Sequence, residues 1–172
     1  QPYNDDLDFG TNDFCVMGWT KKAGTSASAL DFILSREDAT GAGAGFHLYT
    51  TAAGLFTMAI CDDGWSTFDS VAGSTLVDGK WHFFVGLRRG SGIELFVDGS
   101  FVSESTIANA VGSLSNSSAV CRLGVRASGD YANNNGSLAL LRISGTAPTA
   151  DQIRKIYNDE KVLFQPNAKA TL

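Results

Sequence analysis

The sequence predicts an all-β fold, a two-sheet antiparallel β-sandwich with one short C-terminal helix. Runs in which apolar and polar residues alternate recur every ten or so residues, and 19 glycines against 3 prolines supply turns between them. Helical periodicity is confined to one segment near the C-terminus. A chain of 172 residues suits a single domain of this class.

The clearest strand pattern lies between residues 77 and 102. Apolar side chains at every second position from Trp81 to Leu87, and again from Ile93 to Val97, predict two strands joined by a glycine-rich turn. A second tight turn follows at Asp98, because Asp and Gly tolerate positive φ. We expect one set of side chains to face the interior: Trp81, Phe83, Val85, Leu95 and Val97.

The other elements follow in chain order. A strand ends at Trp19, residues 37–45 form a loop, and the remaining strands are predicted at residues 31–35, 46–49, 55–61, 119–125 and 137–144. Thr149 and Gln152 have the spacing of a capping box, which predicts a helix from Thr149 to about Asn158 with Ile153 and Ile156 on its apolar face.

Three segments resemble laminin-G-like domains of the concanavalin A-like lectin/glucanase superfamily. They are DGKWH at residues 78–82 followed by LFVDG at 95–99, DFGT at 8–11, and the run at 136–160. The resemblance implies a concanavalin A-like jelly roll over residues 1–160, used more often to bind than to catalyse, followed by a tail or linker over 161–172. Residues 158–172 also resemble segments that follow such domains in bacteriophage tail and virion proteins.

Composition and charge exclude several classes of function. The formal charge of −5, from 18 acidic and 13 basic residues, argues against binding a phosphate backbone. No apolar run approaches the ~18 residues of a membrane helix, so no membrane insertion is expected. The chain starts at Gln1 without an initiator Met, and we expect a fragment or a processed product.

The cysteines leave two interpretations open. Cys15, Cys61 and Cys121 lie in apolar runs without CxxC spacing, which is typical of buried free thiols. A single disulfide between Cys61 and Cys121 is the alternative.

Catalytic patterns are weak, so we expect no enzyme. Sandwich glucanases need two carboxylates about 5 Å apart on one strand face, and none of the four Glu has an acid at the required spacing. With two histidines and no GxSxG motif, the sequence also gives no sign of a nucleophilic triad.

A calcium ion is the one cofactor that the acidic residues suggest. Asp6, Asp8 and Asp13 lie close together in the sequence, and Asp130 opens an oxygen-rich loop. The laminin-G resemblance implies that Ca²⁺ is frequent, although apolar residues replace the usual acids in the strand at 136–140. Solvated turn acids are the alternative interpretation.

Glycan binding is the leading hypothesis, because aromatic rings stack on sugars and amides bind paired hydroxyls. The candidate residues lie in two loops: Trp65, Phe68, Tyr131, Asn133, Asn134 and Asn135. Trp65 and Tyr131 could instead be hydrophobic lids on the sandwich. We expect a non-enzymatic module of a larger extracellular or virion protein, which attaches to a glycan or a cell-surface receptor beside neighbouring modules. A purely architectural domain is the alternative hypothesis. A glycoside hydrolase is the third hypothesis.

Overall fold

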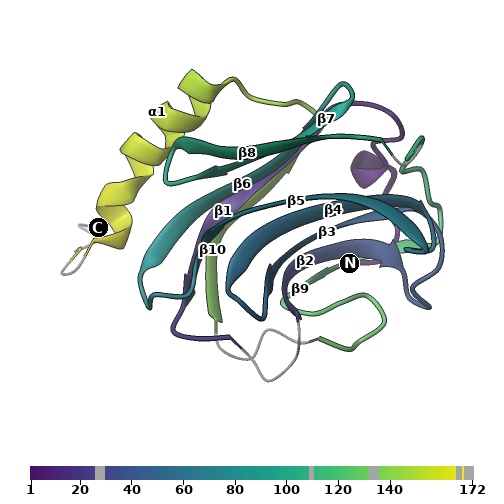
Figure 1. Cartoon of the computed structure of the whole chain (residues 1–172), viewed down its shortest axis with the longest axis horizontal. Coiled ribbons are helices and arrows are strands. Elements are labelled where there is room, and N and C mark those ends of the chain that lie inside the picture. The colour runs from purple at the N-terminus through teal and green to yellow at the C-terminus, as the bar shows by residue number, and fades with distance from the viewer. Residues whose placement is uncertain (26–29, 109–110, 132–135, 166–167, 169–172) are drawn as a thin grey trace.

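The computed structural model describes residues 1–25, 30–108, 111–131, 136–165 and 168 (Figure 1). The described residues form ten strands, one α-helix and two 3-10 turns. The elements are η1 (Asp5–Leu7), β1 (Phe14–Lys22), β2 (Leu30–Asp38), β3 (Gly45–Thr51), β4 (Leu55–Asp63), β5 (Thr67–Thr75), β6 (Trp81–Arg89), β7 (Gly92–Val97), β8 (Ser100–Thr106), β9 (Ala119–Leu123), β10 (Gly136–Ser144), α1 (Ala150–Glu160) and η2 (Lys161–Phe164).

The strands form two antiparallel sheets of five strands each. The first has the order β10-β1-β6-β7-β8, which we call the helix-side sheet, and the second has the order β5-β4-β3-β2-β9, which we call the open sheet. Figure 1 shows the two sheets layered on each other, with α1 against the helix-side sheet. The predicted all-β sandwich with one C-terminal helix is confirmed.

The main core fills the space between the sheets. Phe14 from β1 lies beside Phe46 from β3 with ring centroids 4.7 Å apart, and Phe84 from β6 meets Phe56 from β4 edge to face at 5.5 Å. Leu95 and Val97 belong to the same cluster. Burial of these apolar side chains is the main force that holds the sheets together.

A second apolar cluster lies between the helix-side sheet and α1. Phe83, Val85 and the half-buried Trp81 belong to it, together with Ile153 of the helix. The prediction that Trp81, Phe83 and Val85 share one interior with Leu95 and Val97 is therefore wrong. Helix α1 covers the outer face of β6, so both faces of this strand are buried and alternation alone could not tell them apart.

The helix has the cap that the sequence predicted. Thr149 Oγ1 accepts from Gln152 N at 3.3 Å, and the Gln152 side chain accepts from Thr149 N at 2.8 Å. Ile153 is fully buried and Ile156 packs on the sheet. After the helix, the Phe164 ring stacks on Trp19 at 4.2 Å. The domain boundary at residue 160 stays a prediction.

The structure differs from the expected strands in several places. β1 continues to Lys22, past the end expected at Trp19. β5 and β8 were not predicted because both are edge strands with many polar or exposed side chains. β2 continues to Asp38, through residues that the sequence assigned to a loop from residue 37. Arg36 and Glu37 are buried there because other charged groups pair with them, which a hydropathy pattern does not reveal.

All three cysteines are free thiols, which agrees with the first of the two interpretations. Burial raises the pKa of the Cys15 thiol to about 12, so it is protonated at neutral pH. Among the described residues, no helix has the length and apolar character needed to span a membrane.

Candidate functional site

Aromatic side chains gather on the outer face of the open sheet. In β3, Phe46 and Leu48 point into the core, so His47 and Tyr49 point to the opposite face. Phe32 from β2 joins them, with its ring 5.5 Å from that of Tyr49 and 4.9 Å from that of His47. These three side chains form the floor of the candidate site.

The turn between β4 and β5 folds Trp65 onto this floor. Gly64 has φ +61° and Trp65 has φ +66°, and this left-handed pair reverses the chain within two residues. The Trp65 backbone N–H donates to Cys61 Sγ at 3.0 Å, and the indole ring stacks on His47 with centroids 3.6 Å apart. Phe68 follows on β5, 6.3 Å from Trp65 and 44% exposed.

A second loop, after β9, brings Tyr131 to the same face. Its ring centroid lies 6.1 Å from that of Phe32, and its side chain is 36% exposed. We call Phe32, His47, Tyr49, Trp65, Phe68 and Tyr131 the aromatic face. Trp65, Phe68 and Tyr131, which the sequence proposed as ligand-binding, thus lie on one surface. Asn133, Asn134 and Asn135 lie outside the described residues.

A small cavity of about 150 Å³ opens between these rings. Its lining includes Phe32, His47, Tyr49, Trp65, Phe68 and Arg126. The rings offer flat apolar surface, and Arg126 is the cation among these side chains. This combination suits a ligand that has both an apolar ring face and polar substituents.

Beneath the rings lies a charged network that the sequence did not reveal. The buried Glu37 carboxylate binds Arg126 through two hydrogen bonds, 2.8 Å to Nε and 3.3 Å to Nη2. Its Oε2 also lies 3.1 Å from His47 Nε2. Glu37 lies near the end of β2, His47 lies in β3, and Arg126 comes 89 residues after Glu37, so no local spacing connects them.

The network sets the charges under the aromatic face. Burial lowers the pKa of His47 below its ordinary 6.5 and outweighs the attraction of Glu37, so the imidazole is neutral at pH 7. Burial would raise the pKa of Glu37, but hydrogen bonds from His47 and Arg126 hold it below 4.5. Glu37 is therefore an ionised carboxylate that fixes the position of Arg126.

The four proposed calcium ligands have separate roles. Asp8 lies 3.7 Å from the buried Arg36, Asp13 accepts from Gly90 N at 2.8 Å, and Asp130 binds the Ser128 hydroxyl. Asp6 is exposed in η1. In the part of the chain that the structure describes, no three His, Cys, Asp or Glu side chains form a group able to hold a metal ion. The described residues therefore do not bring these four acids together as one ligand set.

Comparison with known proteins agrees with the fold. The model of the family described as "Concanavalin A-like lectin/glucanases superfamily", of laminin-G type, matches residues 3–154. The chain belongs to this superfamily. Among curated proteins, none matches this concanavalin A-like domain in sequence.

Solved structures similar to this concanavalin A-like domain include three binding domains. The binding domain of Paraclostridial Mosquitocidal Protein 1 has a TM-score of 0.73 at 13% identity; 92% of this chain is covered, and 40% of that chain. The CBM40 of the Ruminococcus gnavus IT-sialidase, bound to α2,3 sialyllactose, has a TM-score of 0.65 at 16% identity. The match covers 87% of this chain and 84% of that chain. The botulinum neurotoxin serotype D ligand-binding domain, in complex with N-acetylneuraminic acid, has a TM-score of 0.66 at 14% identity. The match covers 94% of this chain and 39% of that chain. The domain therefore spans well under half of either toxin chain, and at these identities the likeness establishes the fold.

Proposed function

We propose that this domain is a non-enzymatic glycan-recognition module of a larger extracellular protein. The observation that supports this most directly is the gathering of Trp65, Phe68 and Tyr131 on one face of the open sheet, beside a cavity that Trp65, Phe68 and Arg126 line. Exposed rings stack on the apolar faces of sugars, and Arg126 supplies polar contacts at the cavity. Asn133, Asn134 and Asn135 follow Tyr131 closely in sequence and belong to the same proposal.

The nature of the similar structures supports the proposal. The sialidase CBM40 is a binding module seen with a sialylated sugar, and the botulinum domain is seen with a sialic acid. These ligands belong to those proteins, and they suggest which glycans to test first. The parent of this domain, a cell-surface or virion protein in which residues 161–172 lead to a further module, is part of the same proposal.

The chemistry of Glu37 argues against glycoside hydrolysis at this face. A glycosidase acid needs a raised pKa and access to the glycosidic oxygen. Glu37 is fully buried, is bound to Arg126 and His47, and has a lowered pKa. It can orient a binding arginine, but it cannot deliver a proton to a ligand above it.

The test is an NMR titration of the labelled domain with a panel of neutral and sialylated oligosaccharides. A shallow site predicts a single-site Kd of about 1 mM, so tight attachment would require multivalent display of several copies of the domain. Binding should shift the signals of Trp65, Phe68 and Tyr131 and should be lost in Tyr131→Ala.

The matched control is Phe101→Ala. Phe101 is 53% exposed but lies on β8 of the other sheet, so its removal should leave binding unchanged. If no glycan shifts the aromatic face, the recognition role is wrong and an architectural role replaces it.

A further inference from the structure

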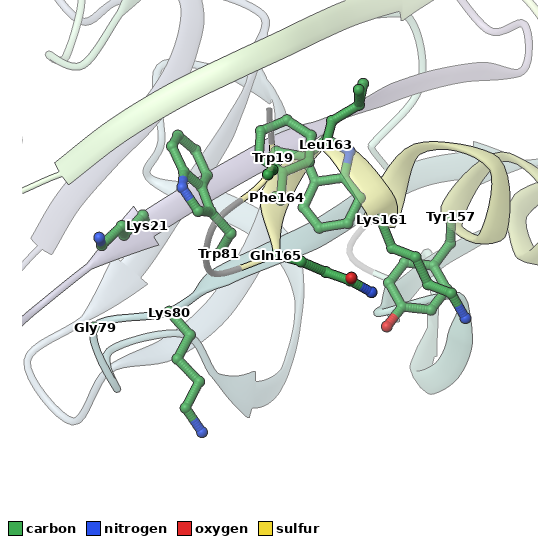
Figure 2. Close-up of a pocket in the computed structure, with 11 residues that line it drawn as sticks. Trp19, Lys21, Gly79, Lys80, Trp81, Tyr157, Lys161, Leu163, Phe164 and Gln165 are labelled. Carbon is green, nitrogen blue, oxygen red and sulfur yellow. The ribbon is translucent and has the colours of Figure 1, made fainter. Parts of the chain in front are cut away.

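A second cavity lies at the other side of the molecule, where α1 and η2 meet the helix-side sheet. It is a groove of about 650 Å³ between the end of β1, the start of β6, the last turn of α1 and η2 (Figure 2). The aromatic face belongs to the outer face of the open sheet, so the whole sandwich separates the two surfaces. This groove has no part in the proposed function.

Aromatic rings form the floor of the groove. Phe164 stacks on the buried Trp19 and lies 4.9 Å from Trp81, and Tyr157 stacks on Trp19 at 5.8 Å from the helix side. Trp81, Tyr157 and Phe164 are each only partly buried, so they also offer ring surface to the groove. Figure 2 shows Trp81, Trp19 and Phe164 close together, with Tyr157 on the helix side of them.

Three lysines surround the rings. Lys21 lies directly opposite Trp81 across the β1–β6 ladder, so both side chains project from the same face of the sheet. Lys80 precedes Trp81, and Lys161 Nζ lies 5.3 Å from the centre of the Tyr157 ring. Among the described residues that line the groove there is no Asp or Glu. In a chain of net charge −5, this is a local concentration of positive charge.

The neighbouring carboxylates already have donors. Asp78 accepts from the Lys80 backbone N–H at 2.9 Å and lies 3.0 Å from His82 Nε2. Glu160 accepts from the Trp19 indole N–H at 2.8 Å and from Arg142. Lys80 Nζ lies 3.6 Å from Asp78 with its side chain 79% exposed, and such an exposed ion pair is weak. Lys80 can therefore turn to a bound anion at little cost.

We infer that this lysine-rimmed groove is a second ligand site, and that it takes an acidic sugar, a ring with a carboxylate or sulfate group. The aromatic floor suits the apolar face of a sugar ring, and the ammonium groups suit its anionic substituent. The volume lies within the range of about 300–1,000 Å³ that is typical of small-ligand sites. The inference does not depend on glycan binding at the aromatic face.

The experiment compares three oligosaccharides of similar length by NMR titration at low salt. They are a heparin-derived tetrasaccharide, which is sulfated, an oligogalacturonate, which is carboxylated, and maltotetraose, which is neutral. Both acidic probes should shift Trp81, Tyr157 and Phe164, and their affinity should fall as salt rises. Maltotetraose should leave these three signals in place.

Single lysine variants locate the site. Lys80→Gln and Lys161→Gln should each weaken binding of the acidic probes about threefold to tenfold. The matched control is Lys155→Gln, which removes the same charge from the neighbouring helix α1; Lys155 pairs with Asp159 at 2.6 Å and lies outside the groove. It should change the affinity less than twofold.

Four results would overturn the inference. The first is equal weakening by Lys155→Gln, which indicates nonspecific attraction. The second is loss of acidic-sugar binding in Tyr131→Ala, which places the ligand on the aromatic face. The third is no shift of the groove signals with either acidic probe. The fourth is stronger binding of a single-stranded oligonucleotide of equal charge, which indicates a different polyanion. The lysine variants leave the aromatic face intact. Failure of the groove as a ligand site can therefore be distinguished from failure of glycan binding at the aromatic face.

Discussion

The imidazole of His47 and the indole of Trp65 lie parallel, with ring centroids 3.6 Å apart and planes 9° from each other. One face of the indole is therefore occupied by protein, and Trp65 acts in part as the lid that covers the Glu37–His47 pair. Phe68 and Tyr131 are more exposed than the other rings of this face. We expect Trp65 to position the aromatic face and Phe68 and Tyr131 to supply most of the contact with a glycan.

This division of roles predicts different results for two alanine variants. Trp65→Ala removes the lid from His47 and should destabilise the domain by about 2–3 kcal/mol. Phe68→Ala should change stability by less than about 0.5 kcal/mol, because the side chain is exposed, but should weaken glycan binding. Urea unfolding and the glycan titration measure the two effects. Equal destabilisation by both variants would mean that Phe68 is a packing residue.

The buried Glu37–His47 pair predicts loss of stability in acid. Burial keeps His47 neutral in the folded state, so the unfolded chain binds a proton more readily as pH falls through 6.5. The pKa of Glu37 is lowered, so its contribution to the stability of the fold is present above pH 4.5 and is lost as the pH falls through the lowered pKa. The melting temperature should fall from pH 7 to pH 4, and His47→Asn should reduce the part of this fall that lies between pH 7 and 5. An unchanged slope in the variant would contradict the assignment.

His82 predicts the opposite dependence. Its Nδ1 lies 2.8 Å from Asp98 Oδ2 and its Nε2 lies 3.0 Å from Asp78 Oδ1, and these carboxylates, Asp98 most of all, raise its pKa above 6.5. The stabilising effect of the charged His82 is complete below pH 6.5 and is lost as the pH rises through the raised pKa. His82→Gln should therefore be more destabilising at pH 6 than at pH 9, as measured by urea unfolding. The same loss at both pH values would mean that the effect does not depend on charge.

The sequence predicted the elements whose pattern is local. Alternation identified β6 and β7, and the spacing of Thr149 and Gln152 gave the helix start. Alternation could not show which face of β6 meets the helix, because α1 buries the side that would otherwise be exposed.

The candidate site was predictable only in its exposed aromatics. Trp65, Phe68 and Tyr131 stand out because large rings in turns need an explanation. The Glu37–His47–Arg126 network was missed because charged residues within a strand look like a loop until their partners, distant in sequence, are placed beside them. The acids near Asp6 show the opposite case, because closeness in sequence does not gather them into one group among the described residues.

A buried ion pair between the two sheets gives a further stability prediction. Lys22 Nζ of β1 lies 2.9 Å from Asp31 Oδ2 of β2, and both side chains are almost completely buried. Lys22→Met should cost about 3–5 kcal/mol because it leaves the Asp31 charge without this partner. The double variant Lys22→Met with Asp31→Leu should recover most of that loss in urea unfolding. A double variant as unstable as the single one would show that the pair itself contributes the stability.

The two apolar clusters predict unequal effects for two aromatic residues of β6. Phe84 is fully buried between the sheets, where it meets Phe56, so Phe84→Ala should cost about 3–5 kcal/mol through the cavity that it leaves. Trp81 is half-buried at the end of the helix-side cluster and contacts Phe164, so water can fill part of the space after Trp81→Ala. The expected cost is about 1–3 kcal/mol. Urea unfolding of both variants measures the difference, and amide exchange in α1 should rise only in Trp81→Ala. If Trp81→Ala destabilises the domain as much as Phe84→Ala, the contacts of Trp81 with η2 are as important to the fold as the core between the sheets.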